Sequence, residues 1–211
     1  MNKRFRRISL TGAFILAMCH PTFLMGQGRF HFDVDYLYHL GLSEKYEDGT
    51  LRRSDCNMGG NAILFAGRYS FTDKLSVGAG FGLDRYTNPD YNTFPVYATL
   101  RYSPIKSALG AYIFTDLGYS FASGEAGISS PTKLLNWADF HSGVLCNAGI
   151  GYSKKMGKNF RMNFRIAYTC KKLRDAYIRT EPYDYDYTDT SKEFSDNLRH
   201  SLSFGVGISF F

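Results

Sequence analysis

The sequence predicts an all-β protein, folded as a transmembrane, antiparallel, up-and-down β-barrel of eight strands. Three observations lead to this fold class. A basic and apolar N-terminal segment is typical of an export signal, apolar and polar residues alternate in eight later segments, and the connections between these segments are alternately long and short. Such alternation marks strands that have one apolar and one polar face. Aromatic residues at 17% and 21 glycines also favour an all-β protein.

Residues 1–28 are predicted to be a signal peptide cleaved near residues 26–28, which leaves residues 29–211 as one barrel domain. A basic stretch is followed by the uncharged, mostly apolar residues 8–19, which is the pattern of a secretory leader. The apolar part is short for a membrane helix of about 20 residues, and Pro21 interrupts it. A retained anchor helix is therefore disfavoured.

Removal of the leader changes what the net charge implies. The whole chain has 25 basic and 19 acidic residues, and four of the basic residues but none of the acidic ones lie within 1–28. The remaining chain has 21 against 19, a net charge of +2, so nucleic acid is not expected as a partner. The three cysteines after the leader, Cys56, Cys146 and Cys170, are an odd number and argue against a disulfide framework.

The eight alternating segments are the predicted strands. In the first, Phe32, Val34 and Tyr36 share one face, while Asp33 and Asp35 share the other. The segments cover residues 30–42, 62–71, 75–84, 96–102, 111–121, 144–153, 160–170 and 201–210.

The predicted connections alternate in length. Residues 72–74, 104–108 and 155–159 read as short turns, whereas the other four connections are longer and polar, at 43–57, 87–95, 122–142 and 172–198. Short turns at one end and long loops at the other are typical of a transmembrane β-barrel in the outer membrane. With an even number of strands, both termini are expected on the short-turn side, which faces the periplasm.

The polar face of the strands indicates which side faces outward. A face in contact with water should be rich in Lys and Glu, but here it carries mainly Gly, Ser, Asn, Tyr and a few Asp and Arg residues. Small groups suit the narrow interior of an eight-stranded barrel, which side chains alone can fill. We therefore expect the apolar face to contact lipid. Charges on that face, at Arg85, Lys154 and His200, fall at strand ends, where they can reach the headgroups.

The C-terminal residues Gly205-Val206-Gly207-Ile208-Ser209-Phe210-Phe211, together with the leader and the alternating loop lengths, resemble the outer-membrane β-barrel proteins, in particular the small OmpX/OmpA-type barrels. The resemblance covers residues 29–211. It implies outer-membrane lipid as a partner and recognition of the C-terminal strand by the barrel-assembly machinery. The register departs from the family by one residue, since Phe210 rather than Phe211 lies on the apolar face.

A charge network is predicted inside the barrel. Because buried charges need partners, we expect these groups to form a plug of ion pairs rather than a polar pore, although the pore remains an alternative. The network comprises four acidic and four basic residues: Asp33, Asp35, Asp84, Asp116, Arg68, Arg101, Arg161 and Arg165.

The sequence does not support a calcium site or a hydrolase-type catalytic group. The acidic run 184–189 lacks the Gly and Glu that a calcium loop of the EF-hand type needs at its sixth and twelfth positions. His200 and Ser201 are adjacent on a strand and so point to opposite faces. His141 and Ser142 have no evident acidic partner. The sequence predicts no catalytic residues, no metal site and no cofactor, and therefore no enzyme.

The predicted function is a structural or surface-interaction role carried by the long loops 43–57, 122–142 and 172–198. Tyr183, Tyr185 and Tyr187 are expected contacts for an extracellular ligand, because tyrosine suits adaptable recognition. A narrow porin-like channel for small solutes and a lipid-modifying enzyme are the alternatives. The sequence leaves open whether the lumen conducts, which ligand the loops bind and whether the protein forms oligomers.

Overall fold

The computed structural model describes residues 29–46, 49–88, 91–104, 110–123, 125–126, 135–183 and 187–211. The predicted leader, residues 1–28, lies outside the described residues, and its cleavage stays a prediction. Within the described ranges, no helix is long and apolar enough to cross a membrane.

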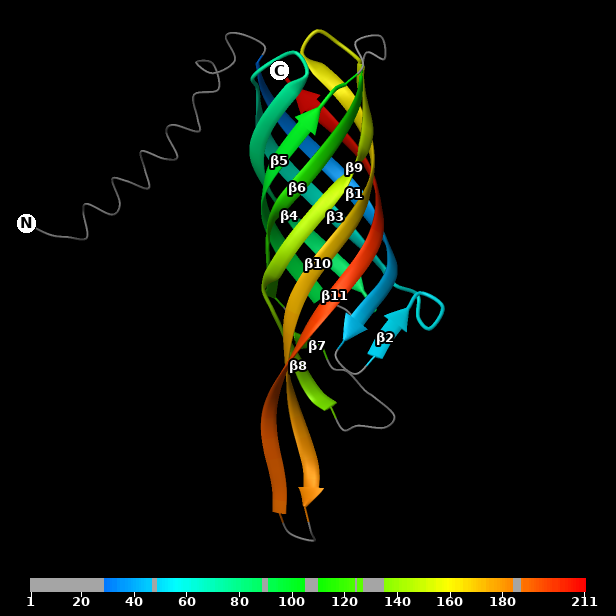
Figure 1. Cartoon of the computed structure of the whole chain (residues 1–211), viewed down its shortest axis with the longest axis vertical. Coiled ribbons are helices and arrows are strands. Elements are labelled where there is room, and N and C mark those ends of the chain that lie inside the picture. Colours follow the sequence, from blue (N-terminus) through cyan, green and yellow to red (C-terminus); the bar gives the residue numbers. More distant parts are fainter. Residues whose placement is uncertain are drawn as a thin grey trace, which may run out of the picture.

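Eight antiparallel strands close into a barrel, as the sequence predicts (Figure 1). Each strand pairs with the next barrel strand along the chain, and the last strand closes the barrel by pairing with the first. Closure leaves no strand edge within the barrel wall, so every strand there has two hydrogen-bonded neighbours. The barrel strands are β1 (Phe30–Tyr46), β3 (Gly59–Ser70), β4 (Leu75–Thr87), β5 (Tyr91–Tyr102), β6 (Ala111–Ser123), β9 (Gly143–Lys155), β10 (Phe160–Tyr183) and β11 (Tyr187–Phe210).

Three shorter strands lie outside the barrel wall. β2 (Gly49–Arg52) pairs with the end of β1, whereas β7 (Glu125–Ala126) pairs with β8 (Leu135–His141), which in turn pairs with β10. All three lie at the end opposite the C-terminus (Figure 1). At the C-terminal end, Phe32 of β1 is opposite Phe210 of β11, so both ends of the described chain lie beside the short turns.

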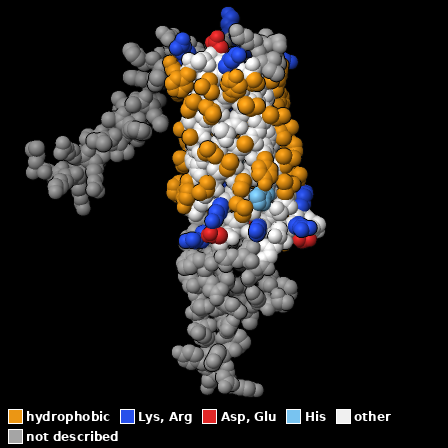
Figure 2. Space-filling view, in the orientation of Figure 1, with side chains coloured by type: hydrophobic (Ala, Val, Ile, Leu, Met, Phe, Trp, Pro, Cys, Tyr) orange, Lys and Arg blue, Asp and Glu red, His pale blue; other side chains and the backbone are white. Residues whose placement is uncertain are grey.

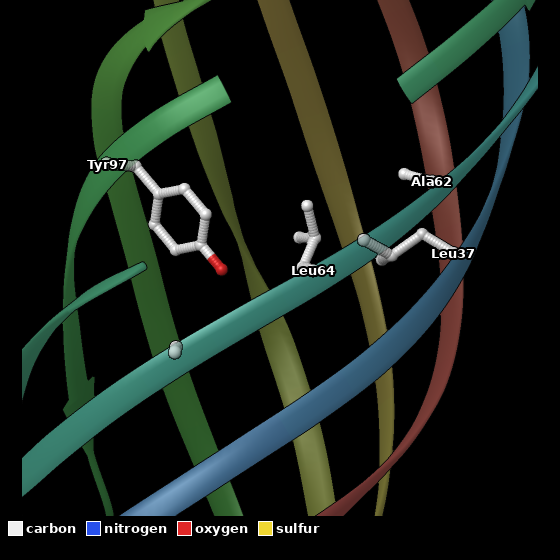
Figure 3. Close-up of a cluster of buried hydrophobic side chains, with 5 residues drawn as sticks. Leu37, Ala62, Leu64 and Tyr97 are labelled. Atoms are coloured by element: carbon white, nitrogen blue, oxygen red, sulfur yellow. The ribbon is translucent and has the colours of Figure 1, made fainter. Parts of the chain in front are cut away.

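The outer surface of the barrel is apolar and its interior is largely polar. Large hydrophobic side chains such as Phe81, Val144 and Ile150 are 57–62% exposed on the outside. They form a belt between two rims that carry charged side chains (Figure 2). The interior also holds clusters of buried hydrophobic side chains, and in one of them Leu37, Leu64 and Tyr97 point inward from three strands (Figure 3). This arrangement matches the predicted faces and is what a lipid-embedded barrel requires.

The prediction of a long loop at 172–198 is wrong. β10 and β11 stay paired without a break in register from Phe160↔Phe210 to Tyr183↔Tyr187, so most of this segment is a β-hairpin that extends beyond the barrel. The strands continue although the apolar alternation stops, because a strand outside the membrane needs no lipid-facing side. A polar strand of this kind lacks apolar alternation, so its sequence predicts a loop.

The other predicted long loops are also partly strands. β1 continues to Tyr46 and pairs with β2, while β4 and β5 shorten the connection at 87–95 to residues 88–90. The segment 122–142 contains β7 and β8. The short turns at 72–74 and 155–159 match the structure more closely, since β3 ends at Ser70, β4 starts at Leu75 and β10 starts at Phe160.

A β-bulge in β1 changes which residues point inward. The pairing with β11 shifts by one residue between Gly41 and Ser43. Before the bulge the odd-numbered residues face the lumen, and after it Glu44 does so and is fully buried. An extra residue in one strand reverses the alternation of faces beyond it. The sequence pattern therefore did not predict that Glu44 faces the lumen.

Candidate functional site in the barrel lumen

Polar and charged side chains fill the lumen in successive layers. Nearest the short turns, the guanidinium of Arg68 forms a bidentate ion pair with Asp33 and donates a 2.9 Å hydrogen bond to Ser76. Ser209 of β11 also donates to Asp33. A second arginine, Arg101, approaches the same carboxylate only to 3.8 Å. This layer therefore places two guanidinium groups around one aspartate.

The middle layer is centred on Arg165 of β10. Its two terminal nitrogens donate to Asp35 at 2.8 Å and to Asp116 at 2.7 Å, so one cation joins carboxylates from β1 and β6. Asn147 of β9 donates a further hydrogen bond to Asp116, and Thr169 donates to the Asn147 carbonyl oxygen. These groups are nearly inaccessible to solvent. The layer thus links β1, β6, β9 and β10.

Two further layers lie toward the hairpin end. Lys171 donates to Asp84 at 2.5 Å and to Thr93 at 2.8 Å. Above them, Arg199 pairs with Glu44 at 3.1 Å, and Asn197 donates to the other oxygen of that carboxylate. These two layers are sealed by stacked aromatic rings, Tyr86 on Tyr91 and His39 on Tyr86. Lys171 and Arg199 are each 1% exposed, so the lumen is filled at this level.

Two interior glycines make room for the charged side chains. A Cβ atom at Gly207 would lie 1.8 Å from a carboxylate oxygen of Asp35 and 2.6 Å from the Val34 carbonyl oxygen. A Cβ atom at Gly78 would lie 2.1 Å from the Gly67 carbonyl oxygen and 2.7 Å from Arg68. The glycines on the polar face therefore have a packing role, since a narrow barrel holds large side chains only where facing positions are empty.

The structure brings together seven of the eight residues predicted for the charge network, and Arg161 is the exception. Arg161 follows the inward-facing alternation of β10, but it lies one residue after the start of the strand and is exposed at the rim. Its guanidinium lies 5.0 Å from the centre of the Phe211 ring. Asp84 lies in the lumen as predicted, but it pairs with Lys171, which is not one of the eight predicted residues. The seven residues within the lumen are Asp33, Asp35, Arg68, Asp84, Arg101, Asp116 and Arg165.

Three charged residues of the lumen were missed by the sequence pattern: Glu44, Lys171 and Arg199. Lys171 follows Thr169 by two residues and Arg199 precedes Ser201 by two, so both continue the inward-facing alternation of their strands. Extending each predicted strand by one step would have found them. Glu44 gave no such signal, because the bulge at Gly41–Ser43 reverses the alternation.

The predicted contact tyrosines lie at the far end of the hairpin. Tyr183 ends β10, Tyr187 begins β11, and the two are paired, whereas Tyr185 lies outside the described residues. At the base of the hairpin, Asp196 accepts hydrogen bonds from Lys172 and Arg174 beyond the apolar belt. These two hydrogen bonds hold the pKa of the Asp196 carboxyl below its usual value.

His200 and Ser201, which were considered for other chemistry, lie on opposite sides of the barrel wall. His200 is hydrogen-bonded to Tyr168 on the outer surface, while Ser201 is buried in the lumen. Among the described residues, no group of three or more His, Cys, Asp or Glu side chains could hold a metal ion. Cys146 of β9 and Cys170 of β10 are directly opposite each other in the pairing of these two strands.

Comparison with known proteins places the fold among outer-membrane β-barrels. No family model and no curated protein matches the sequence. The outer membrane protein OprG from Pseudomonas aeruginosa is similar in structure, with 14% identity, a TM-score of 0.54, and coverage of 86% of this chain and 94% of OprG.

Two other solved structures are less similar in their superposition. The outer membrane protein AlkL has 12% identity and a TM-score of 0.45, covering 85% of this chain and 89% of its own. Neisserial surface protein A has 9% identity and a TM-score of 0.44, covering 86% and 96%. The similarity to OprG shows the barrel fold. The narrower resemblance to OmpX/OmpA-type barrels stays a prediction.

Proposed function

We propose that the protein is an integral outer-membrane barrel with a closed lumen, which presents the β10–β11 hairpin at the cell surface as a contact surface for an extracellular ligand. Both termini would then face the periplasm. The apolar belt and the polar interior support residence in a membrane. The fully buried layers around Arg165, Lys171 and Arg199 support a structural plug and favour this role over a channel. The proposed role involves no catalysis.

The hairpin is the observation that carries the proposal. A barrel strand needs only about 9–11 residues to cross a membrane, whereas β10 and β11 have 24 residues each. The last pair between β10 and β9 is Lys171↔Leu145, so residues 172–183 extend past that neighbour by roughly 40 Å of chain. β8 pairs with the hairpin along part of this length, which broadens the projecting sheet.

An epitope tag tests the orientation and the surface role. A tag inserted after Tyr183, at the tip, should bind antibody on intact cells because the hairpin end projects into the medium. A matched tag inserted after Gly157, in the turn between β9 and β10, should bind antibody only after the outer membrane is opened. Labelling of the turn tag but not the tip tag on intact cells would invert the topology and remove the basis for the surface role.

A path for small solutes is a second candidate function, favoured by one interruption in the barrel wall. Between the pairs Phe81↔Val96 and Asp84↔Thr93, the ladder of β4 and β5 lacks paired residues. Pro95 lies in this gap and has no N–H group to donate. An outer groove of about 420 Å³ lies at the same place, with Leu83 and Phe94 among its mostly apolar walls.

The two candidate functions predict different effects of repairing the ladder. If the gap is a path, Pro95→Val should slow the uptake of labelled toluene by cells that produce the protein, to the rate of cells without it. Equal uptake by cells with the parent, with the variant and without the protein would contradict the path. The surface role would then be the remaining candidate function. Current steps for ions in planar bilayers would contradict the closed lumen on which the surface role rests.

A further inference from the structure

The lumen opens at the short-turn end into a cavity of about 700 Å³. This size is typical of pockets that hold a small molecule. The cavity lies below the ion pair of Arg68 with Asp33, and it is formed by the ends of all eight barrel strands together with the turn between β3 and β4. It is thus separate from the hairpin, which projects from the other end of the barrel.

The described walls of this cavity carry an excess of positive charge. Five basic side chains line it and only one acidic side chain does so: Arg68, Lys74, Arg101, Lys155 and Arg161 against Asp73. Asp33 lies next to the cavity, but Arg68 and Ser209 already occupy its oxygens. Low-dielectric walls around charges of one sign concentrate their field, so a small anion is attracted into the mouth.

Arg101 is a buried cation at this site, and nearby acidic groups compensate its charge only weakly. Its side chain is only 11% exposed, and its closest contact with a carboxylate is 3.8 Å, beyond hydrogen-bonding distance. Its buried Nε atom has no hydrogen-bond partner within the described part of the chain. A buried charged donor without a hydrogen-bond partner is costly, and an anion bound beside it would reduce that cost.

The position of Arg101 is nevertheless firmly fixed. Its guanidinium lies 3.9 Å from the centre of the Tyr112 ring, a cation–π contact that orients its edge. Tyr112 in turn fits only because position 151 is glycine, where a Cβ atom would lie 2.3 Å from the ring. A guanidinium that is held in place but has no carboxylate within hydrogen-bonding distance suits bidentate binding of an oxyanion.

We propose that this cavity is a binding site for a small phosphate-class oxyanion, held by Arg101 inside the mouth and by Lys155 and Arg161 at its rim. The site would be reached from the periplasmic side and is distinct from the surface role of the hairpin. Its ligand is either a free phosphorylated solute or the phosphate of a lipid headgroup beside the mouth. Both have the same chemistry at the guanidinium.

Titration with inorganic phosphate tests the proposal. The full barrel, in micelles of a non-ionic detergent at constant ionic strength, should bind one phosphate per chain, and Arg101→Gln should weaken that binding at least tenfold. Arg52→Gln is the matched control, because Arg52 is exposed in β2 at the opposite end of the barrel, and it should bind as the parent does. Absence of saturable binding by the parent, or unchanged binding by the Arg101 variant, would overturn the proposal.

Two additions keep the result interpretable. If the Arg101 variant does not fold, the double variant Lys155→Gln, Arg161→Gln changes only exposed rim residues and should still weaken binding several-fold. Unchanged binding in this variant would equally count against the site. In bilayer discs that contain phosphatidylglycerol, loss of the phosphate signal seen in micelles identifies the headgroup as the occupant, whereas an unchanged signal identifies a free solute.

Discussion

Replacement of Arg165 by Met tests whether the lumen charges form a plug whose members depend on one another. The side chain of Met has a similar length but no charge, so the change removes the hydrogen bonds to Asp35 at 2.8 Å and to Asp116 at 2.7 Å. Asp116 would keep the hydrogen bond from Asn147. The second oxygen of Asp35 already lacks a hydrogen-bond partner in the described chain, so its carboxylate would be left poorly solvated.

The expected loss in the free energy of unfolding follows from these contacts. Removal of one partner of a buried ion pair costs about 3–5 kcal/mol, because the remaining charge stays buried. Since Arg165 serves two carboxylates, its loss should fall at the upper end of that range. Arg101→Met should cost less, below about 1 kcal/mol, because it loses a cation–π contact and a 3.8 Å approach to Asp33 but also removes a buried donor that has no hydrogen-bond partner in the described chain.

Urea titration of the barrel in lipid vesicles would measure these losses. A folded barrel migrates differently on a gel before and after boiling, so the folded fraction can be read at each urea concentration. The triple variant Arg165→Met, Asp35→Asn, Asp116→Asn removes the stranded charges and should recover most of the lost stability. If Arg165→Met unfolded at the same urea concentration as the parent, the buried network would not stabilise the barrel and the reasoning would be refuted.

Two further predictions follow from close contacts across the barrel wall. Gly207→Ala should destabilise the barrel in the same urea assay, because its Cβ atom would lie 2.6 Å from the Val34 carbonyl oxygen, while Gly49→Ala, with nothing within 4 Å, should unfold like the parent. Mild oxidation should join Cys146 to Cys170, since directly opposed residues of antiparallel strands have Cα atoms about 4.5–5.5 Å apart, within the reach of a disulfide. Mass spectrometry of peptides after digestion would detect that bond, and recovery of both cysteines as free thiols would contradict the register of β9 and β10.

The sequence by itself determined the barrel and its inside and outside. Lipid must contact apolar side chains, and the alternation of a strand is strictly two residues, so Phe32 and Asp33 had to lie on opposite faces. The same rule placed Arg165 and Asp35 in the lumen. It placed Arg161 there wrongly, because alternation gives the face of a residue and not its height along the barrel axis.

Only the tertiary structure decided where the strands end and which charges meet. Outside the membrane nothing forces an apolar face, so the polar extensions of β10 and β11 carry no signal that distinguishes a strand from a loop. The bulge at Gly41–Ser43 turned Glu44 inward to Arg199, although neither residue was a candidate from the pattern. Partner choice among the buried charges depends on the stagger between strands, which only the closed barrel fixes. That stagger pairs Lys171 with Asp84, gives Arg165 two carboxylates, and leaves Arg101 without a close partner at the mouth.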